Sequence, residues 1–302
     1  MAPGFLKGWG NMDKHWQDLF REVLIRDASL QRHNTWGIAG RARMLLVPRS
    51  VDEAVALLEV MDEPFFVLGK GSNVLLPDEP VQRPVILFSG QMGGIQMAGP
   101  SVRVEAGAGL MQLARRMHQA GLSGLEPLSM IPGTVGGGLL MNAGAHGRSL
   151  GDLVVRVRVW QEGSTRWIPA SGLTFGYRSS SLMAPDLVVL EAELCLQPDD
   201  PERIGQAMAQ ARQWRRRQPS GRSAGSVFKN PPGDSAGRLI DACGLKGTRI
   251  GGAVISPVHG NFILNENNAS AADILALIHL CELEVMKVHG VRLAKEVRVI
   301  DS

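Results

Sequence analysis

The stretch from Pro127 to Gly147 constrains the fold of this chain more than any other segment. It is the longest run without a charged residue, and its length would suit a membrane-spanning helix. However, it contains Pro127, Pro132 and six glycines, which are unfavourable inside a helix. We therefore predict a buried, glycine-rich loop. Glycine is enriched throughout, at 36 of 302 residues, which suggests that backbone runs close to a ligand.

Length and composition predict a globular enzyme-sized protein of about two domains. A hydrophobic fraction of 44% and a net charge of +3 exclude a disordered, coiled-coil or collagen-like chain. The near-neutral balance gives no general reason to expect a nucleic-acid or membrane partner. Three distant cysteines in no CxxC pair argue against disulfides and zinc, and no secretory signal is visible at the N-terminus. We therefore expect a cytoplasmic protein.

Hydrophobic periodicity predicts a mixed α+β chain. Residues 1–30 are expected to form a helical lead, since Trp16, Leu19, Phe20, Val23 and Leu24 recur at helical spacing. Further helices are predicted at 51–60, with a Ser50/Glu53 capping box, at 110–119, from about 201 to 219, and after Ser270. The third of these has an inner stripe that ends at Trp214. Strands are predicted at 44–47, 65–68, 85–88, 102–106, 155–159, 187–196, 254–256, 261–264 and 297–300.

The first candidate ligand loop, Gly69-Lys70-Gly71-Ser72-Asn73, follows the predicted strand 65–68. Alternating glycines permit the positive φ angles that turn successive N–H groups toward one anion, and a pyrophosphate would fit there. The loop is neither a Walker A nor a Rossmann motif, and an ordinary tight turn explains it equally well.

A second loop combines Ile131-Pro132-Gly133-Thr134-Val135-Gly136-Gly137-Gly138 with Met141-Asn142-Ala143-Gly144-Ala145-His146-Gly147. So many small residues pack poorly on their own. Such bare backbone would allow a flat ring or a phosphate to lie against the main chain, with the Asn142 amide free to bond it.

These strings resemble a known family. G-K-G-S-N-V-L, G-L-S-G-L-E-P-L-S-M-I-P-G-T-V-G-G and M-N-A-G-A-H-G are similar to the flavin-binding signature of the UDP-N-acetylenolpyruvoylglucosamine reductases, the MurB family. F-G-Y-R-S-S, A-G-S-V-F-K-N-P and K-E-V-R resemble the family's catalytic segments in the same order. The resemblance runs from about Thr35 to Val299.

The resemblance implies a fold and a reaction. It implies a PCMH-type FAD-binding domain at 31–197, with subdomains at about 31–84 and 85–197, and a smaller α+β substrate domain at 198–302 whose final strand returns toward the FAD domain. The implied reaction reduces UDP-N-acetylglucosamine enolpyruvate to UDP-N-acetylmuramate for peptidoglycan synthesis, with FAD as cofactor and NADPH as hydride donor. The implied FAD-binding residues are Gly69, Lys70, Gly71, Ser72, Asn73, Val74, Ile131, Pro132, Gly133, Thr134, Gly136, Gly137, Asn142, Gly144 and Ala145.

The resemblance also implies the roles of individual residues. Arg178 and Glu296 would polarise the substrate carboxylate and the developing enolate, and Ser226 would donate the proton. Taken alone, these residues could be a surface salt bridge, a solvated carboxylate and a turn residue. Tyr177, Arg217, Lys229, Asn230 and Asn261 match positions that line the substrate, although each could equally be a structural polar residue.

The sequence departs from the family pattern in three places, one of which is Pro257-Val258 in place of the more usual charged pair before His259. The short interval between Arg178 and Ser226 resembles the branch that lacks an inserted substrate-covering loop with its extra tyrosine, so closure must be achieved differently. His146 stands where the family usually has tyrosine.

Two other functions stay open: another PCMH-type FAD oxidoreductase acting on a sugar or hydroxy acid, and a non-catalytic nucleotide-sugar or nucleic-acid binder using the Arg212–Arg222 stretch. We expect a monomer with no metal, nucleic-acid or membrane partner.

Overall fold

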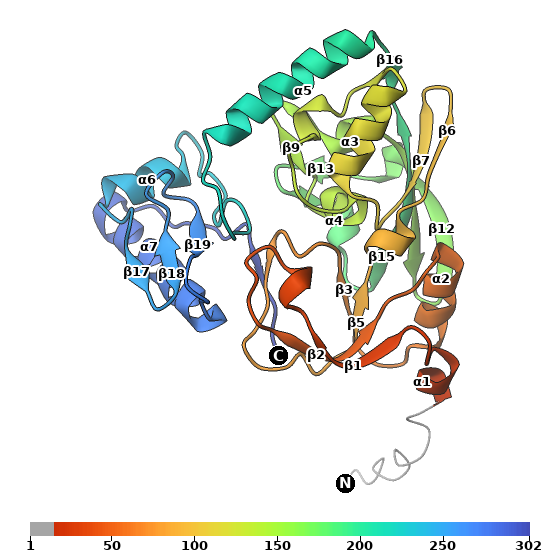
Figure 1. Ribbon diagram of the computed structural model, residues 1–302, viewed down its shortest axis with the longest axis horizontal. Coiled ribbons are helices and arrows are strands. Elements are labelled where there is room, and N and C mark those ends of the chain that lie inside the picture. The colour runs from red at the N-terminus through yellow and green to blue at the C-terminus, as the bar shows by residue number, and fades with distance from the viewer. Residues whose placement is uncertain (1–14) are drawn as a thin grey trace, which may run out of the picture.

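The computed structural model describes residues 15–302 and confirms the mixed α+β class (Figure 1). The first sheet has the order β1 (Leu24–Ser29), β2 (Arg41–Leu46), β5 (Val85–Leu87) and β3 (Phe66–Leu68). The pair β1/β2 is antiparallel, and β2, β5 and β3 are parallel. Since β5 belongs to this sheet, the sheet extends past the predicted subdomain boundary at residue 84.

Helix α2 (Val51–Val60) connects β2 to β3 and begins at an N-cap. The Ser50 side chain accepts a hydrogen bond from the Glu53 N–H. The predicted return bond is wrong, because the Glu53 carboxylate accepts from the N–H of Arg49 instead, at 2.6 Å. The helix therefore has the N-cap hydrogen bond of Ser50 but not the reciprocal bond of a capping box.

The predicted helical lead is wrong over most of its described length. Only His15–Leu19 (α1) is helical, and the residues from Leu24 onward form strand β1. Five backbone register pairs with β2 satisfy the polar groups of this segment, and this pairing overrides the helical spacing of its apolar side chains. Residues 1–14, where the absence of a secretory signal was predicted, lie outside the described part of the chain.

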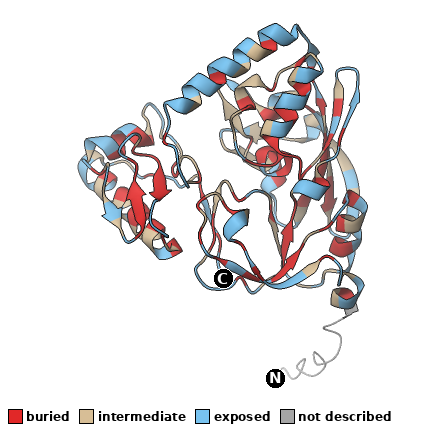
Figure 2. Ribbon diagram, viewed as in Figure 1, coloured by how far each residue is buried: buried red, intermediate tan, exposed pale blue. Residues whose placement is uncertain are grey.

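The second sheet is antiparallel, in the order β12 (Ser164–Pro169), β11 (Val154–Gln161), β15 (Leu187–Cys195), β7 (Ser101–Glu105) and β6 (Ile95–Ala98). Val157 and Val159 of β11 are fully buried, as their alternation with arginines predicts. The same prediction is wrong for Val155, which is exposed, because a register shift between Val154 and Arg156 breaks the alternation. They share one core with α2, α3 (Leu110–Gln119) and α4 (Val135–Leu140). Figure 2 shows this buried layer along the strands.

Helix α4 is a correction, because it lies inside the stretch predicted to be a loop. The Thr134 side chain caps it by accepting from the Gly137 N–H. A Cβ on Gly136 would lie 3.0 Å from the Cβ of Ala106, so the glycine lets the helix approach the end of β7 closely.

The C-terminal domain packs α6 (Ala236–Ala242) and α7 (Ala271–His289) with a sheet of β17 (Arg249–Ile250), β18 (Ala253–Ile255) and β19 (Ile263–Asn265). The predicted start of α7 is confirmed, since Ser270 and Asp273 form a capping box. Trp36, from the first part of the chain, is fully buried in this domain's core. Its indole N–H donates to the carbonyl of Ile263 at 2.8 Å, which fastens the two parts together.

Two further features join the parts of the molecule. Strand β20 (Arg298–Val299) returns to pair in parallel with β4 (Val74–Leu75). Helix α5 (Pro201–Arg216) runs along one edge of the larger body to the C-terminal domain, and packs against α3 and the turn Glu126–Leu128 (Figure 1). Helix α5 therefore packs on the larger, N-terminal body of the molecule, and the C-terminal domain begins after it.

Short elements complete the fold. β8 (Leu122–Ser123) pairs with β16 (Gln197–Pro198), and short 3-10 turns occur at Gln31–His33, Gly90–Met92, Leu150–Leu153, Ala170–Gly172 and Ser181–Met183. Among residues 15–302, no helix combines the length and the apolar character needed to cross a bilayer.

Candidate active site

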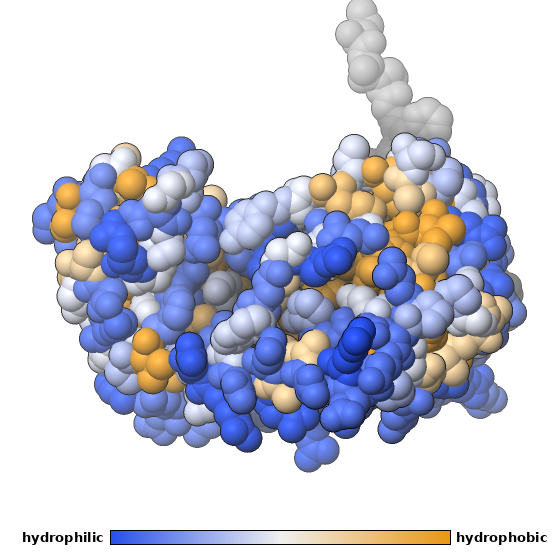
Figure 3. Space-filling view, turned by 90° about the horizontal axis from the view of Figure 1, so that it is seen from above, coloured by the Kyte–Doolittle hydropathy of each residue, from blue (hydrophilic) through white to orange (hydrophobic). Residues whose placement is uncertain are grey.

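A cavity of about 810 Å³ lies where the larger body meets the C-terminal domain. Both glycine-rich loops line it, together with part of α5 and the start of the C-terminal domain. Viewed from above, the surface dips between the two parts (Figure 3). The volume lies within the range of cofactor and ligand sites, which is roughly 300–1,000 Å³.

The first glycine loop follows β3 and is held close to neighbouring backbone. Gly71 has φ +60°, and a Cβ there would lie 2.2 Å from the carbonyl oxygen of His33. The Gly71 carbonyl in turn accepts a hydrogen bond from the Thr35 N–H at 3.1 Å. Only glycine fits this position, so the loop has one well-defined path.

The two glycine loops touch each other. A Cβ on Gly69 would lie 2.6 Å from Oγ1 of Thr134. The Ser72 hydroxyl donates to the carbonyl of Pro132 at 3.0 Å. Loops that are far apart in sequence therefore form one continuous surface of largely bare backbone along the cavity, as a phosphate-bearing cofactor with a flat ring would need.

Most of the residues predicted to bind FAD line this cavity. They are Gly69, Lys70, Gly71, Ser72, Asn73, Val74, Ile131, Pro132, Gly133, Thr134, Gly137, Gly144 and Ala145. Gly136 and Asn142 do not line it. Gly136 serves the packing of α4 described above.

The Asn142 side chain is not free, contrary to the sequence prediction. Its amide N–H donates to the Gly176 carbonyl at 3.0 Å, and its amide oxygen accepts from the Gly151 N–H at 3.0 Å. The residue is buried at φ +43°, a conformation that asparagine tolerates better than most residues. Asn142 therefore holds the hairpin of β13 (Phe175–Gly176) and β14 (Ser179–Ser180) against the second glycine loop.

Arg178 lies in the two-residue turn of that hairpin. Its φ is +53°, an uncommon value for a residue with a side chain. Its guanidinium lies 5.1 Å from the ring centre of Tyr177, and its Nε donates to Oε1 of Glu296 at 2.7 Å. Strained backbone of this kind concentrates at functional sites, where surrounding structure fixes it.

Glu296 is fixed by the C-terminal domain and by the first glycine loop. Its N–H donates to the carbonyl of Val227 at 2.8 Å, and the Asn73 side chain donates to its carbonyl at 3.1 Å. Burial raises the pKa of the Glu296 carboxyl above its ordinary value, although the positive charges of Arg178 and Lys229 oppose this shift. A raised pKa favours the protonated acid, which can donate a hydrogen bond.

Ser226 reaches the same cavity from the C-terminal domain. A backbone bridge to Phe262 fixes its position. Within residues 15–302, its hydroxyl has no hydrogen-bond partner, so it is available to a bound molecule. The structure thus brings Arg178, Ser226 and Glu296 to one cavity from three separate segments.

None of the residues predicted to line the substrate lines the cavity in this structure. Arg217 is exposed beyond the end of α5, and Tyr177 is exposed beside Arg178. Asn261 bonds the N–H and the carbonyl of Phe228, and Asn230 accepts from the N–H of Ala236. These two asparagines therefore have structural partners, and Lys229 contributes its charge near Glu296.

The cavity also includes three arginines that were not predicted to belong to the FAD site, two of them from the arginine-rich stretch. They are Arg215, Arg222 and Arg298. Arg298 could have been found, because alternate residues of an extended segment face the same way and Glu296 had already been placed. Arg215 and Arg222 carried no such signal, since an arginine-rich stretch usually forms a solvated helix face.

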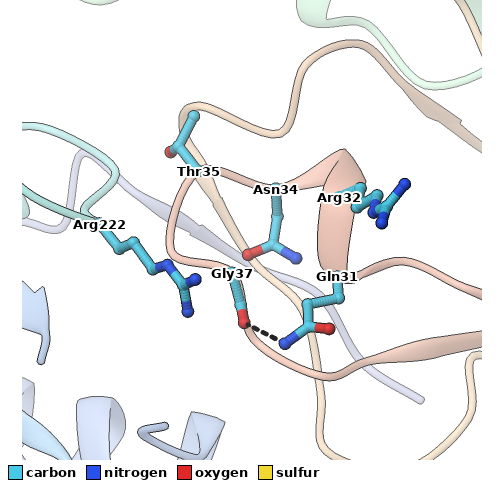
Figure 4. Close-up of a pocket in the computed structure, with 6 residues that line it drawn as sticks. All are labelled: Gln31, Arg32, Asn34, Thr35, Gly37 and Arg222. Atoms are coloured by element: carbon cyan, nitrogen blue, oxygen red, sulfur yellow. Dashed lines mark hydrogen bonds between the residues drawn. The ribbon is translucent and has the colours of Figure 1, made fainter. Parts of the chain in front are cut away.

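A smaller hollow of about 260 Å³ adjoins the cavity and is bounded by the turn after β1 and by Arg222 (Figure 4). Its polar groups are largely committed to the fold. The Gln31 amide donates to the Gly37 carbonyl at 3.4 Å, and the Asn34 amide donates to the carbonyls of Leu30 and Ile38 at 2.9 and 3.1 Å. This hollow carries none of the predicted chemistry.

Comparison with known proteins agrees with this geometry. Residues 42–167 match the family model described as FAD binding domain, and residues 217–300 match the model described as UDP-N-acetylenolpyruvoylglucosamine reductase, C-terminal domain. The predicted FAD-binding domain followed by a smaller C-terminal domain is thus confirmed.

Whole-length relatives carry the same name. The UDP-N-acetylenolpyruvoylglucosamine reductase of Chloroherpeton thalassium is 40% identical over 94% of this chain and 95% of its own length. That of Bacillus subtilis is 38% identical over 96% and 99%. The crystal structure of the reductase from Thermus caldophilus superposes with a TM-score of 0.81 at 38% identity, and covers 92% of this chain and 98% of that one.

Proposed function

Because the chain belongs to the UDP-N-acetylenolpyruvoylglucosamine reductase family, we propose that it is an FAD-containing oxidoreductase that reduces UDP-N-acetylglucosamine enolpyruvate to UDP-N-acetylmuramate with NADPH. The observation that carries this proposal is the meeting of Arg178, Ser226 and Glu296 on one cavity with both glycine-rich loops. The product is a precursor of peptidoglycan.

The loops suit an FAD molecule because they offer close backbone approach, and because the Lys70 side chain lies beside them to neutralise phosphate charge. The FAD that these loops would hold would supply the hydride, which comes from NADPH, to the enolpyruvyl carbon distal to the carboxylate. The residues of the chain must then stabilise negative charge next to that carboxylate and deliver one proton.

Arg178 and protonated Glu296 would donate hydrogen bonds to the substrate carboxylate and the developing enolate. Their 2.7 Å contact shows that the two side chains converge on one point of the cavity. The Ser226 Oγ–H would transfer its proton to the carbon that bears the ether oxygen, and solvent would restore the hydroxyl. The vinyl group thereby gains one hydride and one proton, while NADPH becomes NADP⁺.

An anaerobic visible spectrum tests the proposal. We expect NADPH to bleach the flavin band of the purified protein, and enolpyruvyl-UDP-N-acetylglucosamine to restore it. Reoxidation should be slower by about 10²- to 10⁴-fold in Ser226→Ala, because a positioned proton donor is lost. Ser220→Ala, which changes an exposed hydroxyl outside the cavity lining, is the matched control and should reoxidise at nearly the normal rate.

Other outcomes would identify the alternatives. A flavin that bleaches but is not reoxidised by this substrate would favour another flavin oxidoreductase of similar fold. A protein that cannot be loaded with FAD would favour a nucleotide-sugar binder. The domain boundaries, a monomeric state, a cytoplasmic location and the substrate contacts of Tyr177, Arg217, Lys229, Asn230 and Asn261 stay predictions, as does the absence of nucleic-acid and membrane partners.

A further inference from the structure

Helix α5 lies between the two segments that match family models, at 42–167 and 217–300, and yet it forms part of the cavity wall. Ala211, Trp214, Arg215 and Gln218 line the cavity from this side. Helical periodicity predicts Trp214 on the inner stripe of the helix. That prediction is wrong, because 42% of Trp214 is exposed, whereas Ile204 and Ala211 of the same stripe are buried.

Trp214 instead stacks on His146. The ring centroids are 3.7 Å apart and the rings are inclined by 32°. Both rings line the cavity, so their contact joins α5 to the second glycine loop across the cavity's edge. It is the closest aromatic contact found in residues 15–302.

The backbone around His146 presents its ring toward α5. His146 and Gly147 form the two-residue turn between β9 (Gly144–Ala145) and β10 (Arg148–Ser149), with φ of +53° and +79°. Two successive positive φ values define the tight hairpin turn whose twist matches that of its strands. Histidine is among the residues that tolerate this conformation. Because the hairpin is short and regular, fixing the His146 ring also fixes Gly144 and Ala145, which line the cavity directly.

We propose that His146 and Trp214 form an aromatic clasp that closes the FAD cavity between the β9–β10 hairpin and α5, and that Trp214 is thereby a positioning residue for the cofactor. This inference rests on the proposed function for the identity of the bound molecule. The clasp explains how one edge of the cavity is covered in a chain with a short Arg178–Ser226 interval. Trp214 acts by holding His146 and the β9–β10 hairpin in place. It takes no part in hydride or proton transfer.

The test measures how tightly the purified, FAD-loaded protein keeps its cofactor. The loaded protein is diluted, and FAD release is followed by the rise of flavin fluorescence at equilibrium. Trp214→Ala and His146→Ala should each raise the dissociation constant of FAD about threefold to tenfold, the range expected for loss of one aromatic pair. Iodide should also quench the bound flavin more efficiently in both variants, because the cavity edge is open.

Two further variants separate a clasp from general damage. The double variant should show no larger effect than either single variant, because removal of either ring breaks the same contact. Trp214→Phe keeps an aromatic face and should stay within about twofold of the unmodified protein. Trp167→Ala removes an indole that does not line the cavity and is the matched control, for which we expect unchanged FAD affinity.

An unchanged dissociation constant in both alanine variants, or effects that add in the double variant, would overturn the clasp. Reductase activity of the unmodified protein at saturating FAD keeps the two hypotheses apart. If that activity is present and the variants hold FAD normally, only the clasp fails. If the unmodified protein binds no FAD, the proposed function fails as well.

Discussion

Two arginine–glutamate pairs in this molecule have nearly the same geometry, but the pKa values of their glutamates are shifted in opposite directions. In β11 and β15, Arg156 donates through Nε to Glu193 at 2.6 Å, and its guanidinium lies 4.5 Å from the ring centre of Trp167. At the cavity, Arg178 donates through Nε to Glu296 at 2.7 Å and stacks on Tyr177. Nevertheless, the pKa of Glu193 is lowered and that of Glu296 is raised.

The difference comes from the surroundings of each carboxyl. The hydrogen bond from Arg156 dominates at Glu193, whose side chain is 21% exposed and also accepts a bond from Ser101. Burial dominates at Glu296, whose side chain is only 13% exposed. The contact distance of an ion pair therefore does not show whether it has a catalytic or a structural role. The desolvation of the carboxyl and the strained backbone at Arg178 separate the two cases.

Replacing the two arginines should give the largest contrast. Arg178→Ala should lower kcat/KM by about 10²- to 10³-fold, because one donor to the developing enolate is lost. Arg156→Ala should leave kcat/KM unchanged, because this side chain lies on the sheet face. Steady-state kinetics with both substrates measures the difference. Equal losses in the two variants would mean that Arg178 acts only through the stability of the fold.

The pH dependence of kcat/KM tests the raised pKa of Glu296. If protonated Glu296 donates a hydrogen bond, kcat/KM should fall as the pH rises through its raised pKa, and Glu296→Gln should abolish this decline because the amide always donates. A pH–rate profile of both forms makes the measurement. An alkaline decline that persists in Glu296→Gln would assign it to another group.

Folding stability provides an independent readout of the same contrast. When the pKa of a carboxyl is raised in the folded state, its whole contribution to stability is present at pH values below its pKa in the unfolded state. That contribution is lost as the pH rises through its pKa in the folded state. A carboxyl with a lowered pKa stabilises the fold at higher pH, and its contribution is lost as the pH falls through its folded pKa. Glu296→Gln and Glu193→Gln should therefore change the pH dependence of unfolding in opposite senses, as denaturant titrations at several pH values would show.

Some elements of the fold and of the candidate site could be predicted from the sequence, and others could not. The glycine loops and the strand that carries Arg156 could be read from composition and alternation, since these signals are local. The roles of Arg178, Ser226 and Glu296 came from family resemblance, because three segments far apart in the chain meet only in the folded state. The occupied Asn142 amide and the exposed Trp214 could not be read from the sequence, because tertiary contacts decide which partner a polar or aromatic side chain finds.

Asn142 links Arg178 to the fold of the site, because it anchors the hairpin that presents this arginine. Asn142→Ala should lower stability by about 1–3 kcal/mol, since two part-buried hydrogen bonds of about 0.5–1.5 kcal/mol each are lost, and should also lower kcat through misplacement of Arg178. Asn142→Asp is the matched variant. It keeps the oxygen that accepts from Gly151 and loses the N–H that donates to Gly176, so it should isolate the hairpin bond. A normal kcat in Asn142→Asp would show that the Gly176 bond does not position the arginine.

The smallest effect is expected at the structural pair itself. Arg156 is about half exposed, so its ion pair with Glu193 is screened by solvent, and Arg156→Ala should cost only about 0.2–1 kcal/mol. Arg156→Lys should retain part of the charge interaction and lose the flat stacking on Trp167. Urea unfolding measures the free energy of unfolding of wild type and of Arg156→Lys. If high salt abolishes the difference between these two free energies, the ion pair stabilises this face of the sheet. If the difference persists in salt, stacking on Trp167 does, because cation–ring packing of a partly desolvated guanidinium is less sensitive to screening than a surface ion pair.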